Sequence, residues 1–209
     1  MPGLFITLEG IEGSGKSTQA AALERGLQAL GVPALRTREP GGTDLAEQIR
    51  TLILDVRQEP VHREAELLLF LAARAQHVRG KIRPALEAGR VVICDRFTDA
   101  TLAYQGGGRW VDPTVLAVLN DWASGGTKPD RTYLIDVPAT VGIARAKNRR
   151  GGAGKAALAM ARGVIAVLGQ PTAGLLVTKD GHYGPAAAAA CAGLELCFAG
   201  HPIPDERSV

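Results

Sequence analysis

Apolar positions follow two patterns along the chain as far as about Arg150: short unbroken runs, and longer stretches with helical spacing. The unbroken runs predict buried strands at residues 4–9, 34–37, 90–95 and 131–137. Helical spacing predicts helices at residues 16–30, 44–54, 63–88, 101–105, 113–123 and 139–148, with Asp44 and Glu47 as the N-cap pair of the second helix. This alternation predicts an α/β fold with a doubly wound parallel sheet.

A glycine-rich segment, Gly10-x-x-x-x-Gly15-Lys16-Ser17, follows the first predicted strand and opens the first predicted helix. Its glycines allow backbone N–H groups to face a triphosphate, the lysine reaches the β- and γ-phosphates, and the serine hydroxyl can bind Mg²⁺. The positive N-terminus of the following helix favours the same anion. We therefore expect a P-loop NTPase-type fold that binds ATP and Mg²⁺. The expected nucleotide contacts are Gly10, Ile11, Glu12, Gly13, Ser14, Gly15, Lys16, Ser17 and Thr18.

Charged residues also occur where predicted strands end, at the edge of a parallel sheet where ligands bind. Asp95 is placed to hold Mg²⁺ through water, as a Walker-B acid does, with a helix N-cap as the alternative. Arg96 is placed to grip a phosphate with two hydrogen bonds, with a buried structural pair as the alternative. Arg38 and Glu39 open a Pro-Gly-Gly turn at the end of the second strand.

Two residues four apart on the long predicted helix, Phe70 and Arg74, share one face. Phe70 is able to stack on a base and Arg74 to donate hydrogen bonds to it, although core packing is the simpler explanation for Phe70 alone. Thr101, Tyr104 and Gln105 supply neutral hydrogen-bonding groups of the kind that distinguish one base or sugar from another.

Composition narrows the function further. The net charge is only +3 and the arginines are scattered among carboxylates, which argues against a nucleic-acid partner. The three cysteines have neither metal-binding nor disulfide spacing, and Cys94 lies in an apolar run, where a buried thiol is expected. The N-terminal residues show no signal peptide and no membrane span, so we expect a cytoplasmic protein without a membrane partner. The four histidines share no spacing with a nucleophile, and we interpret them as surface or packing residues.

Four segments in order, FITLEGIEGSGKSTQ, TREPGGT with AEQIR, ELLLFLAARAQHV and DRFTDATLAYQGGGR, resemble bacterial thymidylate kinases over residues 3–150. The resemblance implies a nucleoside monophosphate kinase-like fold, phosphorylation of dTMP by ATP in dTTP synthesis, and a homodimer. It also implies residue roles. Glu12 would meet the sugar 3′-hydroxyl, and Phe70, Arg74, Thr101 and Gln105 would bind thymine. Tyr104 would exclude ribonucleotides, Arg38 and Arg96 would hold the dTMP phosphate, and Asp95 would lie on the magnesium side.

Gly13 stands where some members of that family carry a loop arginine. The resemblance therefore implies that the catalytic arginine comes from the lid, and the candidates are Arg149 and Arg150.

After Arg150 the chain becomes rich in Gly and Ala, and the family's lid, final strand and C-terminal helix are not recognisable. GAGKAALAMARG, LVTKDGHYG and AGHPIPDERSV instead resemble an N-terminal fragment of the glycerate 2-kinases. We therefore expect a kinase-like domain over 1–150 and an atypical segment over 151–209, joined as two gene pieces. The alternative is a divergent tail in which residues 175–178 form the missing edge strand.

Three functions remain open on these grounds: a dTMP kinase whose turnover the atypical C-terminal segment impairs, a nucleotide-binding remnant or gene-fusion product without catalysis, and another small P-loop kinase. Phe70, Arg74 and Gln105 argue against the third.

Overall fold

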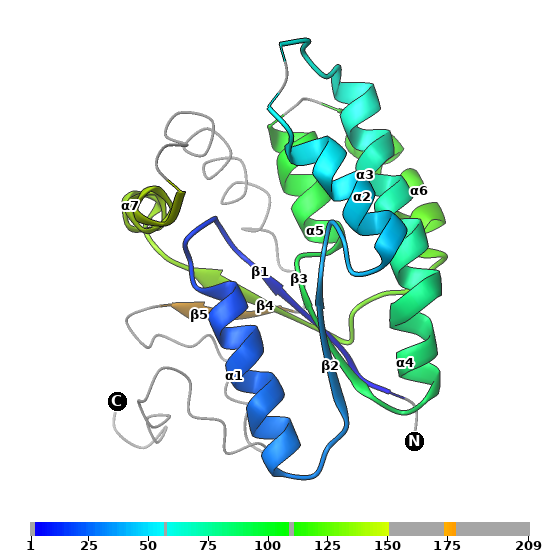
Figure 1. Ribbon diagram of the computed structural model, residues 1–209, viewed down its shortest axis with the longest axis vertical. Helices are drawn as coiled ribbons and strands as arrows, with labels where there is room; N and C mark the ends of the chain where they lie inside the picture. Colours follow the sequence, from blue (N-terminus) through cyan, green and yellow to red (C-terminus); the bar gives the residue numbers. More distant parts are fainter. Residues whose placement is uncertain (1–2, 57, 109–110, 151–173, 179–209) are drawn as a thin grey trace.

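A single parallel sheet organises the protein (Figure 1). The computed structural model describes residues 3–56, 58–108, 111–150 and 174–178, with side chains for all of these except 147–150 and 174–178. The strand order is β2-β3-β1-β4-β5, and the paired strands all run parallel. The strands are β1 (Phe5–Glu9), β2 (Ala34–Arg38), β3 (Val91–Asp95), β4 (Arg131–Asp136) and β5 (Gly174–Thr178). The predicted fold class is confirmed.

Helices cover both faces of the sheet, with α1 on one side and the cluster of α2 to α6 on the other (Figure 1). The helical elements are α1 (Lys16–Ala29), α2 (Asp44–Leu54), α3 (Arg63–His77), α4 (Arg83–Glu87), α5 (Thr98–Thr101), α6 (Pro113–Ser124) and α7 (Ala139–Arg150). Two π-helical segments, η1 (Val78–Ile82) and η2 (Leu102–Gly107), continue α3 and α5. The long helix predicted over 63–88 is therefore present as α3, η1 and α4 in succession.

The central strands β1 and β3 are buried on both faces, which explains their unbroken apolar runs. Ile6, Leu8 and Ile93 pack with α1 on one face. Alternate residues of the same strands, including Phe5 and Val92, pack with η1 and α4 on the other. Cys94 belongs to this second cluster as a buried free thiol, as expected.

The N-cap of α2 differs from the prediction by one residue, although the bounds of the helix agree. Thr43 is the N-cap, because its side chain accepts a hydrogen bond from the backbone N–H of Ala46, while Asp44 is already helical. Glu47 turns back instead, and its carboxylate accepts a hydrogen bond from the N–H of Gly42 at 2.8 Å. The predicted Asp44–Glu47 pair was therefore wrong in its first member: the neighbouring threonine is also a favoured cap, and it has the extended backbone that the position requires.

The atypical segment contributes one described element to the sheet. β5 pairs with β4 in parallel, with Ile135 opposite Val177, so the alternative that residues 175–178 form an edge strand is confirmed. The remainder of 151–209 lies outside the described residues. Within the part of the chain that the structure covers, no helix has the length and apolar character needed to cross a lipid bilayer.

Candidate active site

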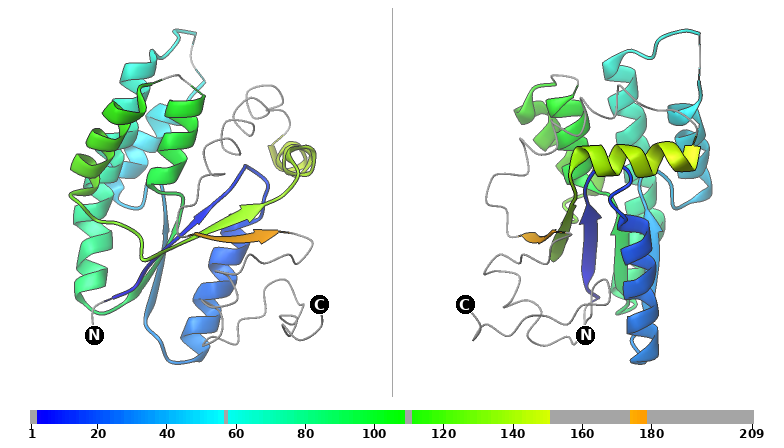
Figure 2. Two further views of the ribbon diagram at one scale, coloured as in Figure 1. Left: turned by 180° about the vertical axis from the view of Figure 1, so that it is seen from behind. Right: turned by 90° about the vertical axis from the view of Figure 1, so that its left-hand side faces the viewer.

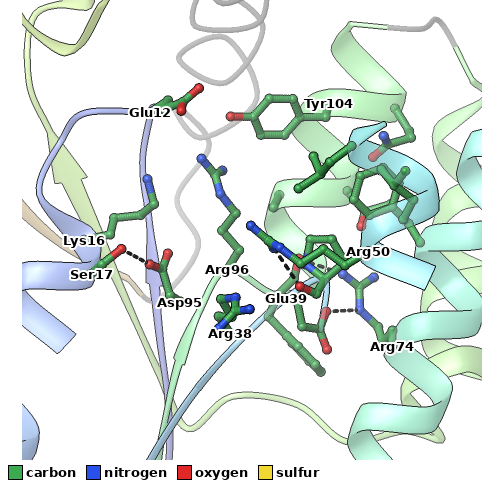
Figure 3. Close-up of a pocket in the computed structure, with 18 of the residues that line it drawn as sticks. Glu12, Lys16, Ser17, Arg38, Glu39, Arg50, Arg74, Asp95, Arg96 and Tyr104 are labelled. Atoms are coloured by element: carbon green, nitrogen blue, oxygen red, sulfur yellow. Dashed lines mark hydrogen bonds and ion pairs between the residues drawn. The ribbon is translucent and has the colours of Figure 1, made fainter. Parts of the chain in front are cut away.

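A cavity of about 520 Å³ opens where β1, β2 and β3 end (Figure 3). The phosphate loop forms one side, and α3 with the β3–η2 segment forms the other. Most of the residues predicted from the sequence line it, including Glu12, Gly13, Gly15, Lys16, Ser17, Thr18, Arg38, Phe70, Arg74, Asp95, Arg96, Thr101, Tyr104 and Gln105. The fold therefore joins the predicted nucleotide loop and the predicted base-binding residues in one space.

The phosphate loop is shaped by glycines with positive φ at Gly10, Gly13 and Gly15. Lys16 is buried behind it, and its Nζ donates hydrogen bonds to the carbonyls of Gly10 at 2.8 Å and Ile11 at 2.7 Å. Burial, helped by the nearby charge of Arg96, lowers the pKa of Lys16 to about 7. The loop carbonyls thus hold the Lys16 amine where the charge of a bound anion would compensate its own. This arrangement fits the phosphate chain of a nucleotide.

Ser17 and Asp95 meet across the base of the cavity, where the serine Oγ donates to Asp95 Oδ2 at 2.6 Å. These two oxygens are ligands that Mg²⁺ prefers. The alternative role of Asp95, as a helix N-cap, was wrong, because Phe97 is the N-cap of α5. Among the described residues no group of three or more His, Cys, Asp or Glu is placed to hold a metal ion. One hydroxyl and one carboxylate suit a magnesium ion that takes its other ligands from phosphates and water.

Arg96 is the one non-glycine residue with positive φ in the described part of the chain, at 72°. Its backbone N–H donates to the carbonyl of Leu8 at 3.0 Å, and the next N–H, of Phe97, donates to Glu9 Oε1 at 2.8 Å. Its guanidinium carbon lies 5.1 Å from the centre of the Tyr104 ring. These contacts hold Arg96 in a strained conformation that directs its side chain into the cavity (Figure 3).

Glu9 is a buried carboxyl group at the end of β1, and the sequence analysis gave it no role. Burial raises its pKa to about 7, although the charge of Arg96 acts in the opposite direction. The signal in the sequence that could have identified Glu9 was its place as a charged residue at the end of an apolar strand, directly before Gly10.

Arg74 is almost fully buried and belongs to a polar network that links α3, β2 and α6. Its Nε donates to Glu39 Oε2 at 2.8 Å, Nη2 donates to the carbonyl of Phe97 at 2.9 Å, and Nη1 donates to Asn120. These contacts use three of its five N–H groups and leave donor capacity toward the cavity that it lines. Arg74 is therefore held rigidly at the cavity wall.

The other members of this network are Glu39 and His77. His77 is completely buried, with its ring nitrogens 3.1 Å from Glu39 Oε1 and 2.7 Å from Thr37 Oγ1. Burial acts to raise the pKa of Glu39, but Arg74 and His77 outweigh it and hold that pKa below its ordinary value. The expectation that His77 is a packing residue holds, but its packing is polar and supports Glu39.

The remaining predicted contacts lie around the far side of the cavity. Phe70 is half-buried and lines the cavity, so core packing does not account for it. Thr101 and Gln105 are buried, and Gln105 Nε2 donates to Glu66 Oε1 at 3.1 Å. Arg38, on the phosphate side, pairs with Glu47 at 2.8 Å.

Some lining residues were missed, and some predicted ones lie elsewhere. Glu66 and Arg50 line the cavity without having been assigned a role, although Arg50 closes the AEQIR segment that the sequence analysis had singled out. Gly10, Ile11 and Ser14 belong to the loop without lining the cavity. Arg149 and Arg150 end α7, but their side chains lie outside the described residues.

Comparison with known proteins gives matches over the same part of the chain. The family model described as thymidylate kinase matches residues 8–159. The thymidylate kinase of Ectopseudomonas mendocina (strain ymp) is 56% identical over 149 residues, which is 71% of each chain. That of Desulfovibrio desulfuricans is 56% identical over 151 residues, covering 72% of this chain and 70% of the relative.

A solved structure and a second family model complete the comparison. The crystal structure of thymidylate kinase from Ehrlichia chaffeensis matches with a TM-score of 0.62 and 41% identity, covering 71% of this chain and 84% of that one. A model described as a domain of unknown function (DUF4147) matches residues 150–209.

Proposed function

The chain belongs to the thymidylate kinase family, and from that premise we propose how its cavity phosphorylates dTMP to dTDP with MgATP. The family expected from the sequence motifs is confirmed, and its identity to thymidylate kinases shows that the chain is a dTMP kinase. A catalytically inactive remnant is not favoured, since identity reaches 56% over 149 residues. The observation that carries the proposal is the shared cavity of about 520 Å³, which the phosphate loop and the Phe70–Arg74 wall both line.

On the donor side, the loop residues Gly10 to Thr18 would hold the ATP phosphates, with Lys16 as the cation. Ser17 and Asp95, already 2.6 Å apart, would hold Mg²⁺. When bound, MgATP supplies the γ-phosphoryl group, and the metal neutralises phosphate oxygens. The role of the protein is to position the reactants and neutralise charge, and no covalent enzyme intermediate is required.

On the acceptor side, Phe70 would stack on the thymine ring, while Arg74, Thr101 and Gln105 would bind its edge. Their rigid placement supports this, since Arg74 is fixed by three hydrogen bonds and Gln105 by Glu66. A base-binding group that cannot reorient discriminates better between acceptors than a mobile one.

The acceptor's sugar and phosphate would be bound next to the phosphate loop. Glu12 would meet the 3′-hydroxyl, and Tyr104 would occupy the space of a 2′-hydroxyl. Arg38 and Arg96 would bind the dTMP phosphate, with Arg96 directed inward by its left-handed backbone. Two guanidinium groups suit a phosphate dianion because each can donate two parallel hydrogen bonds.

We further propose that Arg149 or Arg150 supplies the catalytic arginine. Gly13 in the loop has no side chain, and α7, which crosses over the phosphate loop, ends at these two arginines (Figure 2). An arginine that reaches the transferring phosphoryl group contributes about 10³- to 10⁵-fold to the rate in comparable enzymes.

We propose a domain boundary near residue 150, with a kinase domain over 1–150 and a segment related to the glycerate 2-kinases over 151–209. The two family matches support the boundary, since one ends at 159 and the other begins at 150. β5 ties the second segment to the kinase sheet. Successive N–H groups of a strand point to opposite edges, so replacing both Leu176 and Val177 by Pro removes a donor that faces β4 and should lower the melting temperature. An unchanged melting temperature would show that β5 contributes nothing to the fold.

We propose that two copies of the chain associate through α3 and α6, and that the enzyme acts in the cytoplasm. Val115, Val118 and Trp122 lie on one face of α6 with exposures of 48%, 64% and 74%, and Leu68 on α3 is 61% exposed. Light scattering should therefore give a dimer mass. Trp122→Ser should shift it toward the monomer, and a monomeric parent would contradict the proposal.

Acceptor selectivity tests the proposed base site. With MgATP constant, we expect turnover of dTMP to exceed that of dUMP, dCMP and dGMP. Phe70→Ala should raise the KM for dTMP by about 10- to 100-fold, because stacking on a base contributes about 1–3 kcal/mol. Equal turnover of all four acceptors, or an unchanged KM in Phe70→Ala, would refute the assignment of this wall to thymine.

A further inference from the structure

The outer wall of the phosphate loop is formed by the segment from the end of β4 into α7. Figure 2 shows α7 crossing over the end of β1 and the start of α1, where the loop lies. A Cβ atom placed on Gly10 would lie 2.5 Å from the carbonyl oxygen of Ile135. Ile11 is buried against Val137 and Ala139. One side of the loop faces the cavity, and its other side therefore packs against this segment.

The closest approach is between two glycines, Gly13 in the loop and Gly142 in α7. A Cβ atom on Gly13 would collide with the backbone carbonyl of Gly142. A Cβ atom on Gly142 would collide with the end of the Ile11 side chain and lie 2.8 Å from the carbonyl oxygen of Glu12. Since the Glu12 oxygen is backbone, the loop itself would have to move to accommodate a side chain at position 142.

Gly142 is unusual for its place in the fold. It lies inside α7, where glycine is less favourable than alanine, and its φ is not in the left-handed region that would require glycine. Close approach of the loop is the one feature of its surroundings that accounts for a glycine here. The same crossing leaves no room for a side chain at Gly13, which fits a catalytic arginine supplied from elsewhere.

We propose that Gly142 is a positioning residue for the phosphate loop: its missing side chain lets α7 support the loop in the shape that receives ATP. The proposal rests on the proposed role of the loop as the ATP site. It also couples the position of α7, which ends at Arg149 and Arg150, to the geometry of the loop. A displacement of α7 would therefore move Gly13 in the loop as well as Ala146, the residue of α7 that lines the cavity.

Gly142→Ala tests this proposal because the two effects of the substitution have opposite signs. Alanine favours the helix, whereas its collision with the loop costs stability, so the melting temperature should change little. The affinity for MgATP, measured by titration calorimetry, should fall at least tenfold. The affinity for dTMP should fall much less, since Glu12 is the one proposed dTMP contact in the part of the loop that Gly142 touches.

Two matched controls are available in the chain. Gly80→Ala makes the same change in a helical segment where the new Cβ would lie 3.4 Å from Thr43 Cγ2, an ordinary contact, and should leave both affinities unchanged. Ile11→Val combined with Gly142→Ala removes the Ile11 Cδ1 atom, and should recover part of the lost MgATP affinity. General damage to the fold would not be relieved by this second change. The double variant also supplies the measurement if Gly142→Ala alone does not fold.

The outcomes separate this inference from the proposed function. If the parent protein binds MgATP and Gly142→Ala binds it equally well, the inference is wrong and the proposed function stands. If Gly142→Ala loses MgATP and dTMP affinity to the same extent, the residue is merely structural and the inference is again wrong. If the parent itself binds no MgATP, the proposed function fails first.

Discussion

Replacing Glu39 by Gln should destabilise the protein far more than its small change in volume suggests. The carboxylate is 2.8 Å from Arg74 Nε, and the two side chains are only 5% and 3% exposed. The amide that replaces the carboxylate would keep an oxygen that accepts a hydrogen bond but would remove the charge that compensates the buried guanidinium. The free energy of unfolding should therefore fall.

The magnitude follows from the burial of the pair. Breaking a buried ion pair by removing one partner lowers the free energy of unfolding by about 3–5 kcal/mol, and the retained acceptor favours the lower end. At about 2–4 °C per kcal/mol for a chain of this size, the melting temperature should drop by roughly 6–12 °C. Urea denaturation and thermal melting both measure this change.

A matched control is Glu24→Gln, which breaks the ion pair between Glu24 and Arg36. Its distance is 2.7 Å, almost the same, but the side chains of Arg36 and Glu24 are 44% and 21% exposed. Because solvent screens such a pair, the loss should stay below about 1 kcal/mol. Equal losses in the two variants would refute the reasoning that burial, and not distance, sets the strength of the Glu39–Arg74 pair.

The effect of Glu39→Gln should also depend on pH. The folded-state pKa of Glu39 is lowered by Arg74 and His77 against the effect of burial, so the stability that this carboxylate contributes is present above its unfolded pKa of about 4.5. It is lost as the pH falls through the lower folded value. The difference between parent and variant should therefore be full at pH 7 and shrink in acid, and a difference that grows in acid would contradict the assignment.

Two further predictions concern Arg96 and its support. Burial raises the pKa of Glu9 to about 7, so the stability that its protonated form contributes is present below about pH 4.5 and is lost as the pH rises through 7. Glu9→Gln should abolish this loss of stability. Parallel curves of stability against pH for parent and variant would contradict the prediction. Arg96→Lys should raise the KM for dTMP about tenfold or more, because lysine cannot form the paired hydrogen bonds of a guanidinium, and it should change the KM for ATP little. An unchanged KM for dTMP in steady-state kinetics would exclude Arg96 from the acceptor site.

Local motifs explain why most of the cavity could be predicted from the sequence. The phosphate loop is a continuous segment, and Asp95 follows a recognisable strand, so the 2.6 Å contact between Ser17 and Asp95 needed only the rule that parallel strands end at one edge. Phe70 and Arg74 were placed together by helical spacing alone.

The supporting network could not be predicted in the same way. Glu39 bonds to Arg74 35 positions away, and Glu9 bonds to Phe97 88 positions away, so neither partner is visible in a local pattern. The N-cap of α2 was misplaced by one residue because Thr43 and Asp44 are both good caps, and only the backbone conformation distinguishes them. β5 could be predicted only as an alternative, because a short apolar run after a change in composition does not reveal that its pairing partner is β4.

Transfer of ³²P from [γ-³²P]ATP to dTMP by the full chain, with Lys16→Ala as control, tests the central claim most directly. The account predicts labelled dTDP from the parent protein, dependent on Mg²⁺ and abolished in Lys16→Ala, because the same cavity holds donor and acceptor. Folded parent protein that binds both nucleotides but transfers no label, or transfer that survives in Lys16→Ala, would contradict it.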